Sequence, residues 1–347
     1  MTAAVFAQDK RFDVQSRLVL VPATVIDAKG AVIDGLDARD FIVLDNGRQQ
    51  TASADPAGTV GTPVALIVAI QTSGISAAAL DKVRKIGAMI QPVVTGALGC
   101  TAVVAFSENV RWLTDCTNNE DTLGRAFDQL KPGEPKAARM LDAVFEAIER
   151  LRQRSNTRRV LILISETRDR GSETALSEAV LAAQNAAVTL YAVTYSAFKT
   201  GFTSKIPVSI VLPASTQKKG PADVFGTVSG GPPRCGPAAC IDPPLPPPEQ
   251  RVDLLGAMEE VNRLGKTNTT KALAIGTGGA TFAFTRLQGL EEAIQKLGAD
   301  LHSQYLLSFS PSESDGRYHK LEVQVVRRDA QVRARPGYWS AQAQQPQ

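Results

Sequence analysis

The sequence predicts an α/β fold, in which a doubly wound, mostly parallel sheet with helices on both faces is joined to a small β domain built from the two ends of the chain. Uninterrupted apolar runs at residues 64–70 and 160–164 suit strands buried on both faces, as in a parallel sheet covered by helices. Helical patterns separate these runs, whereas residues 12–50 and 304–340 hold short strand patterns and turns. We therefore expect an α/β domain between two β segments that pair with each other.

The overall composition is ordinary for a globular protein. Of 347 residues, 44% are hydrophobic and 21% are charged, which argues against wholesale disorder and allows two domains with separate cores. The formal net charge of +3 and the lack of a basic stripe with interleaved aromatic residues argue against nucleic acid as a partner. No stretch reaches the roughly 18 uninterrupted apolar residues of a membrane-spanning helix, so we expect no membrane span.

The N-terminal segment, residues 1–11, predicts export. Val5-Phe6-Ala7 before Gln8 resembles a signal-peptidase site, without the basic and apolar regions that normally precede one. We interpret the segment as the remnant of a truncated signal peptide or a disordered N-terminus. The alternative is a frayed N-terminus of a cytoplasmic protein.

The four cysteines form two natural pairs. Cys100 and Cys116 flank a predicted hairpin that places them opposite each other, and Cys235 and Cys240 close a tiny loop. Neither spacing matches the paired short knuckles of a zinc site. We therefore expect two disulfides and an extracytoplasmic protein, either periplasmic or secreted.

The N-terminal β segment covers residues 12–50. Alternating apolar residues run to residue 27, and Asp-Ala-Lys-Gly at 27–30 is a turn signal. A second strand from residue 40 leads into a hairpin at Asn46-Gly47. Residues 51–62 are small and rich in glycine and proline, and are predicted to be a linker.

The predicted α/β domain covers residues 63–303. Its central strand at 64–70 ends in small polar residues, after which Ser76 can cap a helix. Further strands are expected at 101–106, 110–113, 160–165, 188–194 and 281–284, and helices at 76–92, 119–130, 137–154, 173–187, 252–264 and 288–302. Residues 276–280 are glycine-rich but lead into a strand, so they predict a turn rather than a phosphate-binding loop, which would open onto a helix.

Two segments stand outside this alternation. Residues 197–250 form a Pro- and Gly-rich insertion that is expected to be disordered, with its proline run acting as a stiff spacer or, alternatively, as a ligand for an aromatic-lined groove. The C-terminal β segment, 304–340, has strand patterns that should pair with residues 12–50, and residues 341–347 are expected to be a disordered tail.

The pattern resembles the von Willebrand factor type A (VWA) domain, a Rossmann-like fold. The central strand with its small polar loop, the early antiparallel hairpin and the helices around the sheet carry this resemblance. The ends, including Gln304-Tyr305-Leu306-Leu307-Ser308-Phe309 and Arg333-Ala334-Arg335-Pro336-Gly337-Tyr338-Trp339, are similar to those of the bacterial "VWFA-related" proteins frequent in acidobacteria. The resemblance covers residues 12–340 apart from the insertion.

The resemblance implies a metal-ion-dependent adhesion site, in which an Asp-x-Ser-x-Ser loop, a Thr and an Asp hold Mg²⁺. At the loop positions this chain has Gln71, Ser73 and Ile75, and at the other two it has Ala138 and Glu166. A hard cation needs several oxygen ligands in near-octahedral geometry, which these residues do not supply. We therefore predict a degenerate site with no cofactor. Weak Mg²⁺-dependent binding is the alternative, with Ser76 or Asp169 compensating.

Basic residues occupy the loops that would ring this site. Lys136, Arg139, Arg168 and Arg170 could bind an acidic protein partner directly, since guanidinium groups match carboxylates bidentately. The alternative is that they are ordinary solvated charges. The predicted partner-binding residues are Gln71, Ser73, Ser76, Arg139, Glu166, Arg168 and Asp169.

Catalysis is not expected. The two histidines, His302 and His319, lie far apart in the sequence and are each predicted to be surface residues. Ser73 follows a strand as hydrolase nucleophiles do, but lacks the Gly-x-Ser-x-Gly context. Glu166 and Asp169 could form a carboxylate pair. We predict a non-enzymatic binding or scaffold protein, with a hydrolase using Ser73 as the remaining alternative.

Overall fold

The computed structural model describes residues 18–56, 62–134, 137–195, 268–284, 286–313, 315–327 and 329–340. The predictions for residues 1–11, 197–250 and 341–347, the helix at 252–264, Lys136 and the Cys235–Cys240 pair lie outside these ranges. The domain boundaries predicted from the sequence remain predictions.

A six-stranded sheet forms the centre of the α/β part, in the order β10-β9-β8-β5-β6-β7. Its strands are β5 (Val64–Gln71), β6 (Cys100–Phe106), β7 (Val110–Thr117), β8 (Arg158–Ser165), β9 (Val188–Tyr195) and β10 (Thr281–Phe284). Every neighbouring pair is parallel except β6 and β7, which form the predicted antiparallel hairpin. All residues of β5 are buried, as expected for a central strand covered on both faces. The predicted fold class is confirmed.

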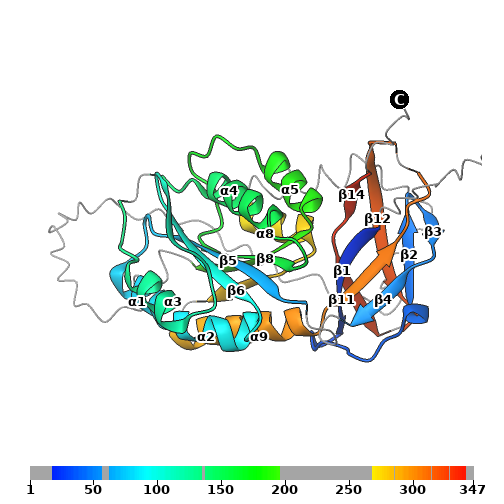
Figure 1. The fold of residues 1–347 in the computed structure, drawn as a ribbon, viewed down its shortest axis with the longest axis horizontal. Helices are drawn as coiled ribbons and strands as arrows, with labels where there is room; N and C mark the ends of the chain where they lie inside the picture. The colour runs from blue at the N-terminus through cyan, green and yellow to red at the C-terminus, as the bar shows by residue number, and fades with distance from the viewer. Residues whose placement is uncertain are drawn as a thin grey trace, which may run out of the picture. The chain divides into compact units, whose positions relative to one another are not determined.

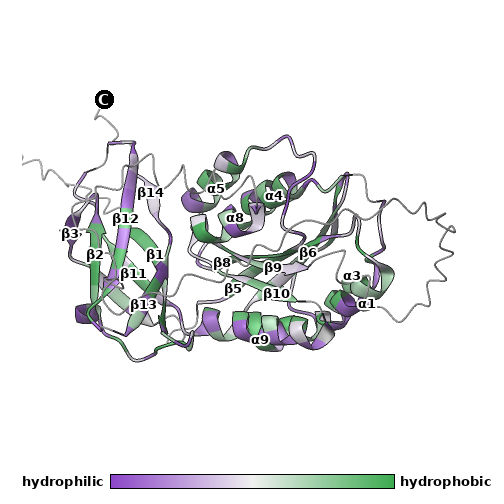
Figure 2. Ribbon diagram, turned by 180° about the vertical axis from the view of Figure 1, so that it is seen from behind, coloured by the Kyte–Doolittle hydropathy of each residue, from purple (hydrophilic) through white to green (hydrophobic). Residues whose placement is uncertain are grey.

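Helices cover both faces of this sheet (Figure 1). One layer consists of α4 (Met140–Arg152), α5 (Leu176–Asn185) and α8 (Thr269–Thr277), and the other of α1 (Ala77–Lys85), α2 (Gly87–Ile90), α3 (Glu120–Asp128) and α9 (Leu287–His302). Each layer shares an apolar core with one face of the strands. In Figure 2 the central strands are green and α9 carries both colours, as expected for a helix with one buried face.

The helix predicted at 76–92 is divided into α1, α2 and a π-helical turn over Gln91–Thr95. Proline at the start of that turn cannot donate to the preceding helical turn, which accounts for the irregular end. Helix α8 was not predicted. It is capped by Asn268 and ends at Gly278, whose φ of 77° is left-handed, so the predicted turn begins only there.

Gly279 fixes how this turn passes the sheet. A Cβ atom at this position would lie 1.8 Å from the carbonyl oxygen of Leu190 on β9. Only glycine therefore allows the chain to approach β9 closely enough for β10 to pair with it. The glycine-rich stretch serves backbone packing.

The two ends of the chain pair into two antiparallel four-stranded sheets, in the orders β13-β1-β11-β4 and β14-β12-β2-β3. Their strands are β1 (Val19–Asp27), β2 (Phe41–Asp45), β3 (Arg48–Gln50), β4 (Ser53–Pro56), β11 (Tyr305–Phe309), β12 (Tyr318–Val325), β13 (Ala330–Ala334) and β14 (Gly337–Trp339); a 3-10 turn, Ala38–Asp40, precedes β2. The predicted pairing of N- and C-terminal segments is confirmed by β1 with β11 and by β2 with β12. Strand β4 lies within the stretch predicted as a linker, and it pairs with β11.

His319 corrects a prediction. It was expected on the surface, but only 2% of it is exposed. Its Nδ1 lies 2.8 Å from Asp45 Oδ1 and its Nε2 lies 3.1 Å from Asp315 Oδ1, while the Tyr338 hydroxyl donates to Asp45 Oδ2 at 2.9 Å. The pattern of a β-strand shows which residues alternate between its two faces. It does not show that carboxylates on other segments supply the hydrogen bonds that a buried imidazole needs.

A disulfide joins Cys100 and Cys116, with 5.2 Å between their Cα atoms, as predicted from the hairpin. It ties the edge strand β7 to β6. Among the helices in the described ranges, none is long and apolar enough to cross a membrane.

Candidate functional site

The loops that follow β5 and β8 meet the N-terminus of α4 at the carboxyl end of the central sheet. Ligands commonly bind at this edge in open α/β folds. The β5 loop begins at Gln71, the β8 loop begins at Glu166, and the β8 loop pairs with the chain before α4 through reciprocal backbone bonds between Ala138 and Arg170. The fold thus brings the predicted region together from three separate parts of the sequence.

Gln71 and Glu166 clamp the two loops to each other. The Gln71 side-chain amide donates to the Ser73 carbonyl oxygen at 2.9 Å and to Glu166 Oε2 at 3.1 Å, and its own oxygen accepts from the Glu166 N–H at 3.1 Å. Arg170 places a guanidinium nitrogen 3.0 Å from the same Glu166 oxygen. The carboxylate at this sheet edge is therefore neutralised by a fixed cation of the protein.

The remaining residues of the β5 loop point inward or cap a helix. Ser73 is fully buried, and its Oγ has no hydrogen-bond partner among the described residues. Ile75 is buried in the apolar core on the α1 side. The Ser76 hydroxyl accepts from the Ala79 N–H at 3.2 Å, so it caps α1 as predicted.

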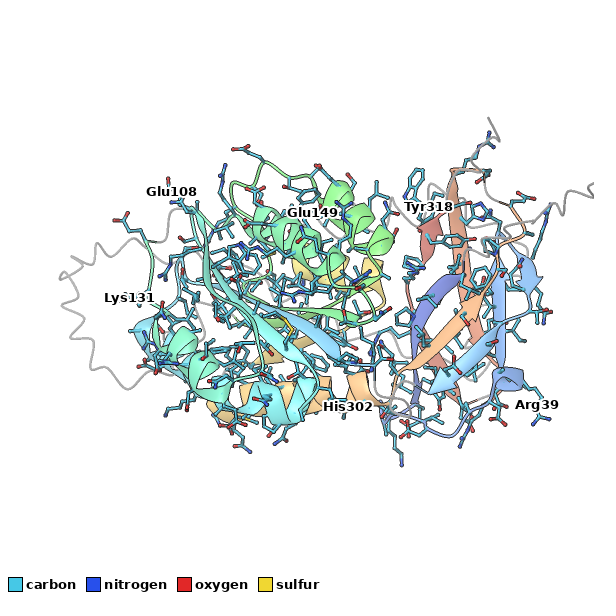
Figure 3. The ribbon with its side chains drawn as sticks, viewed as in Figure 1. Arg39, Glu108, Lys131, Glu149, His302 and Tyr318 are labelled. Atoms are coloured by element: carbon cyan, nitrogen blue, oxygen red, sulfur yellow. A yellow bond between two sulfur atoms is a disulfide. The ribbon has the colours of Figure 1, made fainter. Side chains whose placement is uncertain are left out.

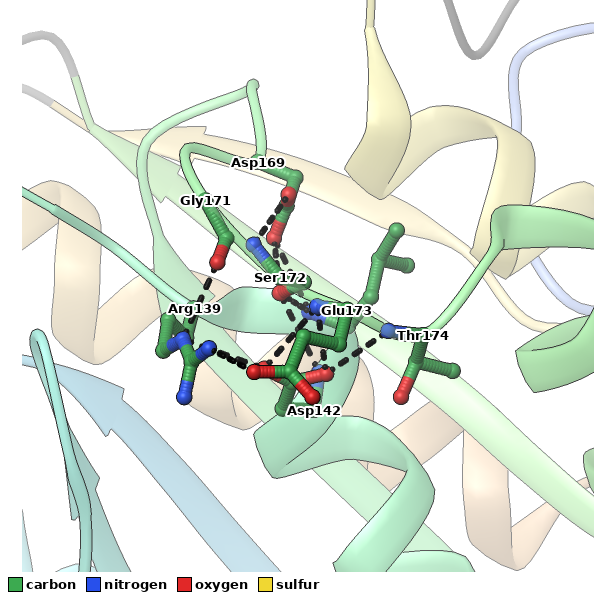
Figure 4. A network of polar contacts seen from close by, with 8 residues as sticks. Arg139, Asp142, Asp169, Gly171, Ser172, Glu173 and Thr174 are labelled. Atoms are coloured by element: carbon green, nitrogen blue, oxygen red, sulfur yellow. Dashed lines mark hydrogen bonds and ion pairs between the residues drawn. The ribbon is translucent and has the colours of Figure 1, made fainter.

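Asp169 and Ser172 cap α4 from the β8 loop. The N-cap residue of α4, Arg139, supplies no side-chain cap. Instead, Asp169 Oδ1 accepts from the Leu141 N–H at 3.1 Å and from the Ser172 hydroxyl at 2.6 Å, while the Ser172 oxygen accepts from two N–H groups of the first helical turn (Figure 4). These bonds satisfy orphan donors of the helix end, which fixes the loop against the helix.

Asp142 makes the reverse connection, from α4 back to the loop. Its carboxylate accepts from the backbone N–H groups of Glu173 and Thr174 at 2.9–3.2 Å (Figure 4). Burial by itself would raise the pKa of Asp142, but these hydrogen bonds and the charge of Arg139 lower it overall. Two carboxylates thus join the β8 loop to α4, with Asp169 on the loop and Asp142 on the helix.

Arg139 lies on the rim of this network. Its Nε donates to the Gly171 carbonyl oxygen at 3.0 Å, and its terminal nitrogen contacts Glu173 Oε1 at 2.5 Å. The hydrogen bond to Glu173 raises the pKa of Arg139. The Glu173 side chain is 85% exposed, so this ion pair lies at the surface.

The predicted site residues therefore take different roles. Gln71 and Glu166 lie together, Asp169 supports α4, and Arg168 is exposed and makes contacts of its own. The sequence analysis missed Asp142, Ser172, Glu173 and Thr174. Ser and Asp are favoured at helix caps, so their presence in the β8 loop was a usable signal. They cap α4, however, which begins some thirty residues earlier in the chain.

A bound Mg²⁺ ion would require several oxygen ligands at these positions. Ile75 and Ala138 are buried and offer no side-chain oxygen, while the Gln71, Ser76 and Glu166 oxygens already accept bonds within the protein. In the described parts of the chain, no group of three or more His, Cys, Asp or Glu side chains could hold a metal ion. The Gln71, Ser76 and Glu166 oxygens are thus engaged within the protein, whereas the Ser73 Oγ has no partner among the described residues.

A catalytic arrangement around Ser73 would need a base. The chain has two histidines. His302, at the end of α9 (Figure 3), contacts the Val93 carbonyl oxygen at 3.2 Å, and His319 is enclosed by Asp45 and Asp315 in the terminal β sheets. Neither imidazole hydrogen-bonds to Ser73.

No protein-family model and no curated protein matches the chain. Among solved structures, BatB from Bacteroides thetaiotaomicron is similar at 12% identity and a TM-score of 0.43, covering 69% of this chain and 98% of that one. Proximal thread matrix protein 1 from the mussel byssus, with a zinc-occupied MIDAS motif, is similar at 9% identity and a TM-score of 0.46, covering 75% and 50%. The vWF domain of the type V pili tip protein Mfa5 from Porphyromonas gingivalis reaches 18% identity and a TM-score of 0.29, covering 32% and 40%. Likenesses at this level do not assign the chain to a family.

Proposed function

We propose that this chain is a non-enzymatic, extracytoplasmic protein-binding module whose α/β domain carries a degenerate metal-ion-dependent adhesion site. The observation that supports it best is the Gln71–Glu166–Arg170 cluster. A carboxylate that already has a guanidinium at 3.0 Å and an amide at 3.1 Å gains little from a divalent cation. Binding at this edge of the sheet would then proceed without metal.

The loops around the cluster suit recognition because they are held in place before any partner arrives. Asp169, Ser172 and Asp142 fix the β8 loop to the N-terminus of α4. A loop held in this way loses little conformational entropy on binding, which leaves more of the interaction energy for affinity.

An acidic protein is the proposed partner, and Arg139 is its proposed anchor. The Glu173 side chain is 85% exposed and that of Arg139 is 32% exposed, so a partner carboxylate could replace Glu173 at small cost while Asp142 stays 3.4 Å from the guanidinium. Glu173 then acts as an internal competitor. Removing it should expose a ready-oriented guanidinium, which can bind a carboxylate in a bidentate geometry.

Selection of peptides from a displayed random library, carried out in chelator, tests this proposal. Acidic peptides should be enriched, and calorimetry should then show that Glu173→Gln tightens their binding about two- to fivefold, as expected for release of an exposed ion pair. Arg139→Glu should abolish binding. Enrichment of neutral peptides, or binding that is indifferent to both substitutions, would contradict the proposal.

A thermal-shift titration with Mg²⁺ and Mn²⁺ against chelator distinguishes the Mg²⁺-dependent alternative from metal-independent binding. A ligand that binds only the folded state raises the unfolding temperature as its concentration rises. We expect no rise up to millimolar metal. A rise that Glu166→Ala removes would establish the metal-dependent alternative.

The absence of enzymatic activity is also part of the proposal. Ser73 is fully buried, which denies it access to a substrate. Turnover of ester or peptide substrates that Ser73→Ala abolishes would establish the hydrolase alternative. The extracytoplasmic location rests on the Cys100–Cys116 disulfide, because such bonds persist mainly in oxidising compartments.

A further inference from the structure

Arg335, in the connection between β13 and β14, is a buried cation without a carboxylate partner among the described residues. Only 7% of it is exposed. Its terminal nitrogens donate to the carbonyl oxygens of Gln184 at 2.9 Å and Leu20 at 2.8 Å, and its Nε has no partner. Burial lowers the pKa of Arg335 to about 10, so the side chain stays charged at neutral pH.

The neighbouring helix offsets only part of this charge. Gln184 lies in the last turn of α5, where the aligned peptide dipoles place about half a negative charge. The hydrogen bonds of Arg335 to the carbonyl oxygens of Gln184 and Leu20 connect α5 to β1. They leave a net positive charge and one unused N–H at a site from which water is largely excluded.

A pocket of about 220 Å³ opens onto Arg335. Its lining includes Leu18, Leu20 and Trp339, which are 57%, 40% and 44% exposed. These are three of the six large hydrophobic side chains that are exposed in the described parts of the chain. Exposed apolar side chains that gather around one concave site, with a few polar groups, are typical of ligand pockets.

A second pocket, of about 290 Å³, shares Leu20 and Ala187 with the first, so the two adjoin. Pro22, Val160 and Leu306 contribute apolar walls to it. Arg158 and Arg159 also line it, and their guanidinium groups donate to backbone carbonyl oxygens. The first pocket thus offers a cation without a carboxylate partner among the described residues, and the second extends the apolar surface away from it. A ligand that matches both carries an anionic group at one end and an apolar chain or ring behind it.

We propose that these adjoining pockets bind a carboxylate carried on an apolar group, with the carboxylate paired with the Arg335 guanidinium and the apolar part lying against Leu20 and Trp339. Two sources supply this chemistry, namely a free aliphatic acid and the C-terminus of a peptide that ends in an apolar residue. The site is separate from the loops after β5 and β8, and the inference does not depend on the function proposed for them.

Calorimetry on the full chain with two matched probe pairs tests the ligand class. Decanoate is compared with decanol, and N-acetyl-phenylalanine with its amide. Each carboxylate should bind about tenfold or more tightly than its neutral counterpart, as expected for one charge-assisted hydrogen bond. Binding of decanoate identifies a free acid as the source, and binding of N-acetyl-phenylalanine identifies a peptide terminus. Equal binding of charged and neutral probes, or no binding of any probe, would overturn the proposal.

Substitutions locate the site. Trp339→Ala and Leu18→Ser should each weaken binding of the carboxylate several-fold, because they remove apolar surface from the pocket wall. Leu98→Ser is the matched control, since Leu98 is 74% exposed and does not line either pocket. Arg335→Met removes the charge and should bring the carboxylate to the affinity of the neutral probe. If the control weakens binding as much as Trp339→Ala does, the pocket is not the site.

Discussion

Replacing His319 with leucine should destabilise the protein in a way that depends on pH. The imidazole lies between Asp45 and Asp315 and is almost completely buried. Burial by itself would lower the pKa of His319, but the hydrogen bonds and charges of the two carboxylates raise it above its ordinary value. Tyr338 adds its hydroxyl to Asp45, and Arg335 faces the Tyr338 ring from 5.9 Å.

The magnitude follows from what the substitution leaves behind. Asp45 is 3% exposed, and without His319 it keeps the Tyr338 hydroxyl as its one side-chain donor among the described residues. Breaking a buried ion pair by removing one partner costs about 3 to 5 kcal/mol. Because the hydrogen bond from Tyr338 remains, we expect the lower end of this range. At pH values below neutral, His319→Leu should reduce the free energy of unfolding by about 3 kcal/mol.

The direction of the pH dependence follows from the raised pKa. A group whose pKa is higher in the folded state stabilises fully below its unfolded pKa, about 6.5 for histidine, and loses that contribution as the pH rises through the folded value. The difference in unfolding free energy between the wild type and His319→Leu should therefore be largest near pH 5.5 to 6.5 and should become smaller above pH 6.5. The lowered pKa of Asp315 adds stability that is lost only in stronger acid.

Urea denaturation at a series of pH values from 5.5 to 9 measures this difference. His302→Gln is the matched control, because His302 is exposed and its ring hydrogen-bonds to the Val93 carbonyl oxygen rather than to a carboxylate. Asp315→Asn should leave a weaker pH dependence, since Asp45 still faces the imidazole. A difference that stays constant across the series would refute the argument that His319 is charged between the two carboxylates.

Three further predictions concern stability. Asp169→Ala should cost about 1 to 2 kcal/mol in urea denaturation, because it removes a cap of α4. Gly279→Ala should cost at least about 3 kcal/mol and lower the unfolding temperature, because its Cβ would clash with the Leu190 carbonyl oxygen; an unchanged transition would contradict the close approach of this turn to β9. Cys116→Ser should cost about 3 kcal/mol under non-reducing conditions, since the disulfide with Cys100 closes a short loop; reduction of the wild type should reproduce this loss.

The candidate site shows where local patterns stop being informative. The position of the loop after β5 could be predicted, since a long apolar run followed by Gln71 and Ser73 indicates the end of a buried strand. Its chemistry could not be predicted in full. Gln71 bonds to Glu166 and Ser172 caps α4 only where the folded chain brings the β5 loop, the β8 loop and α4 together. Such partners are distant in sequence and have no characteristic spacing.

Local patterns were enough to predict the six strands of the central sheet, the fold class, the Cys100–Cys116 hairpin and the pairing of the two ends, because periodicity and turn residues act over a few positions. Which charges form ion pairs and which are buried depends on the tertiary structure. His319 is a core residue, and Arg335 is a buried cation beside a pocket, with no carboxylate partner in the described parts of the chain. Burial and ion pairing depend on contacts between residues hundreds of positions apart, such as Arg335 with Leu20, and these exist only in the folded chain.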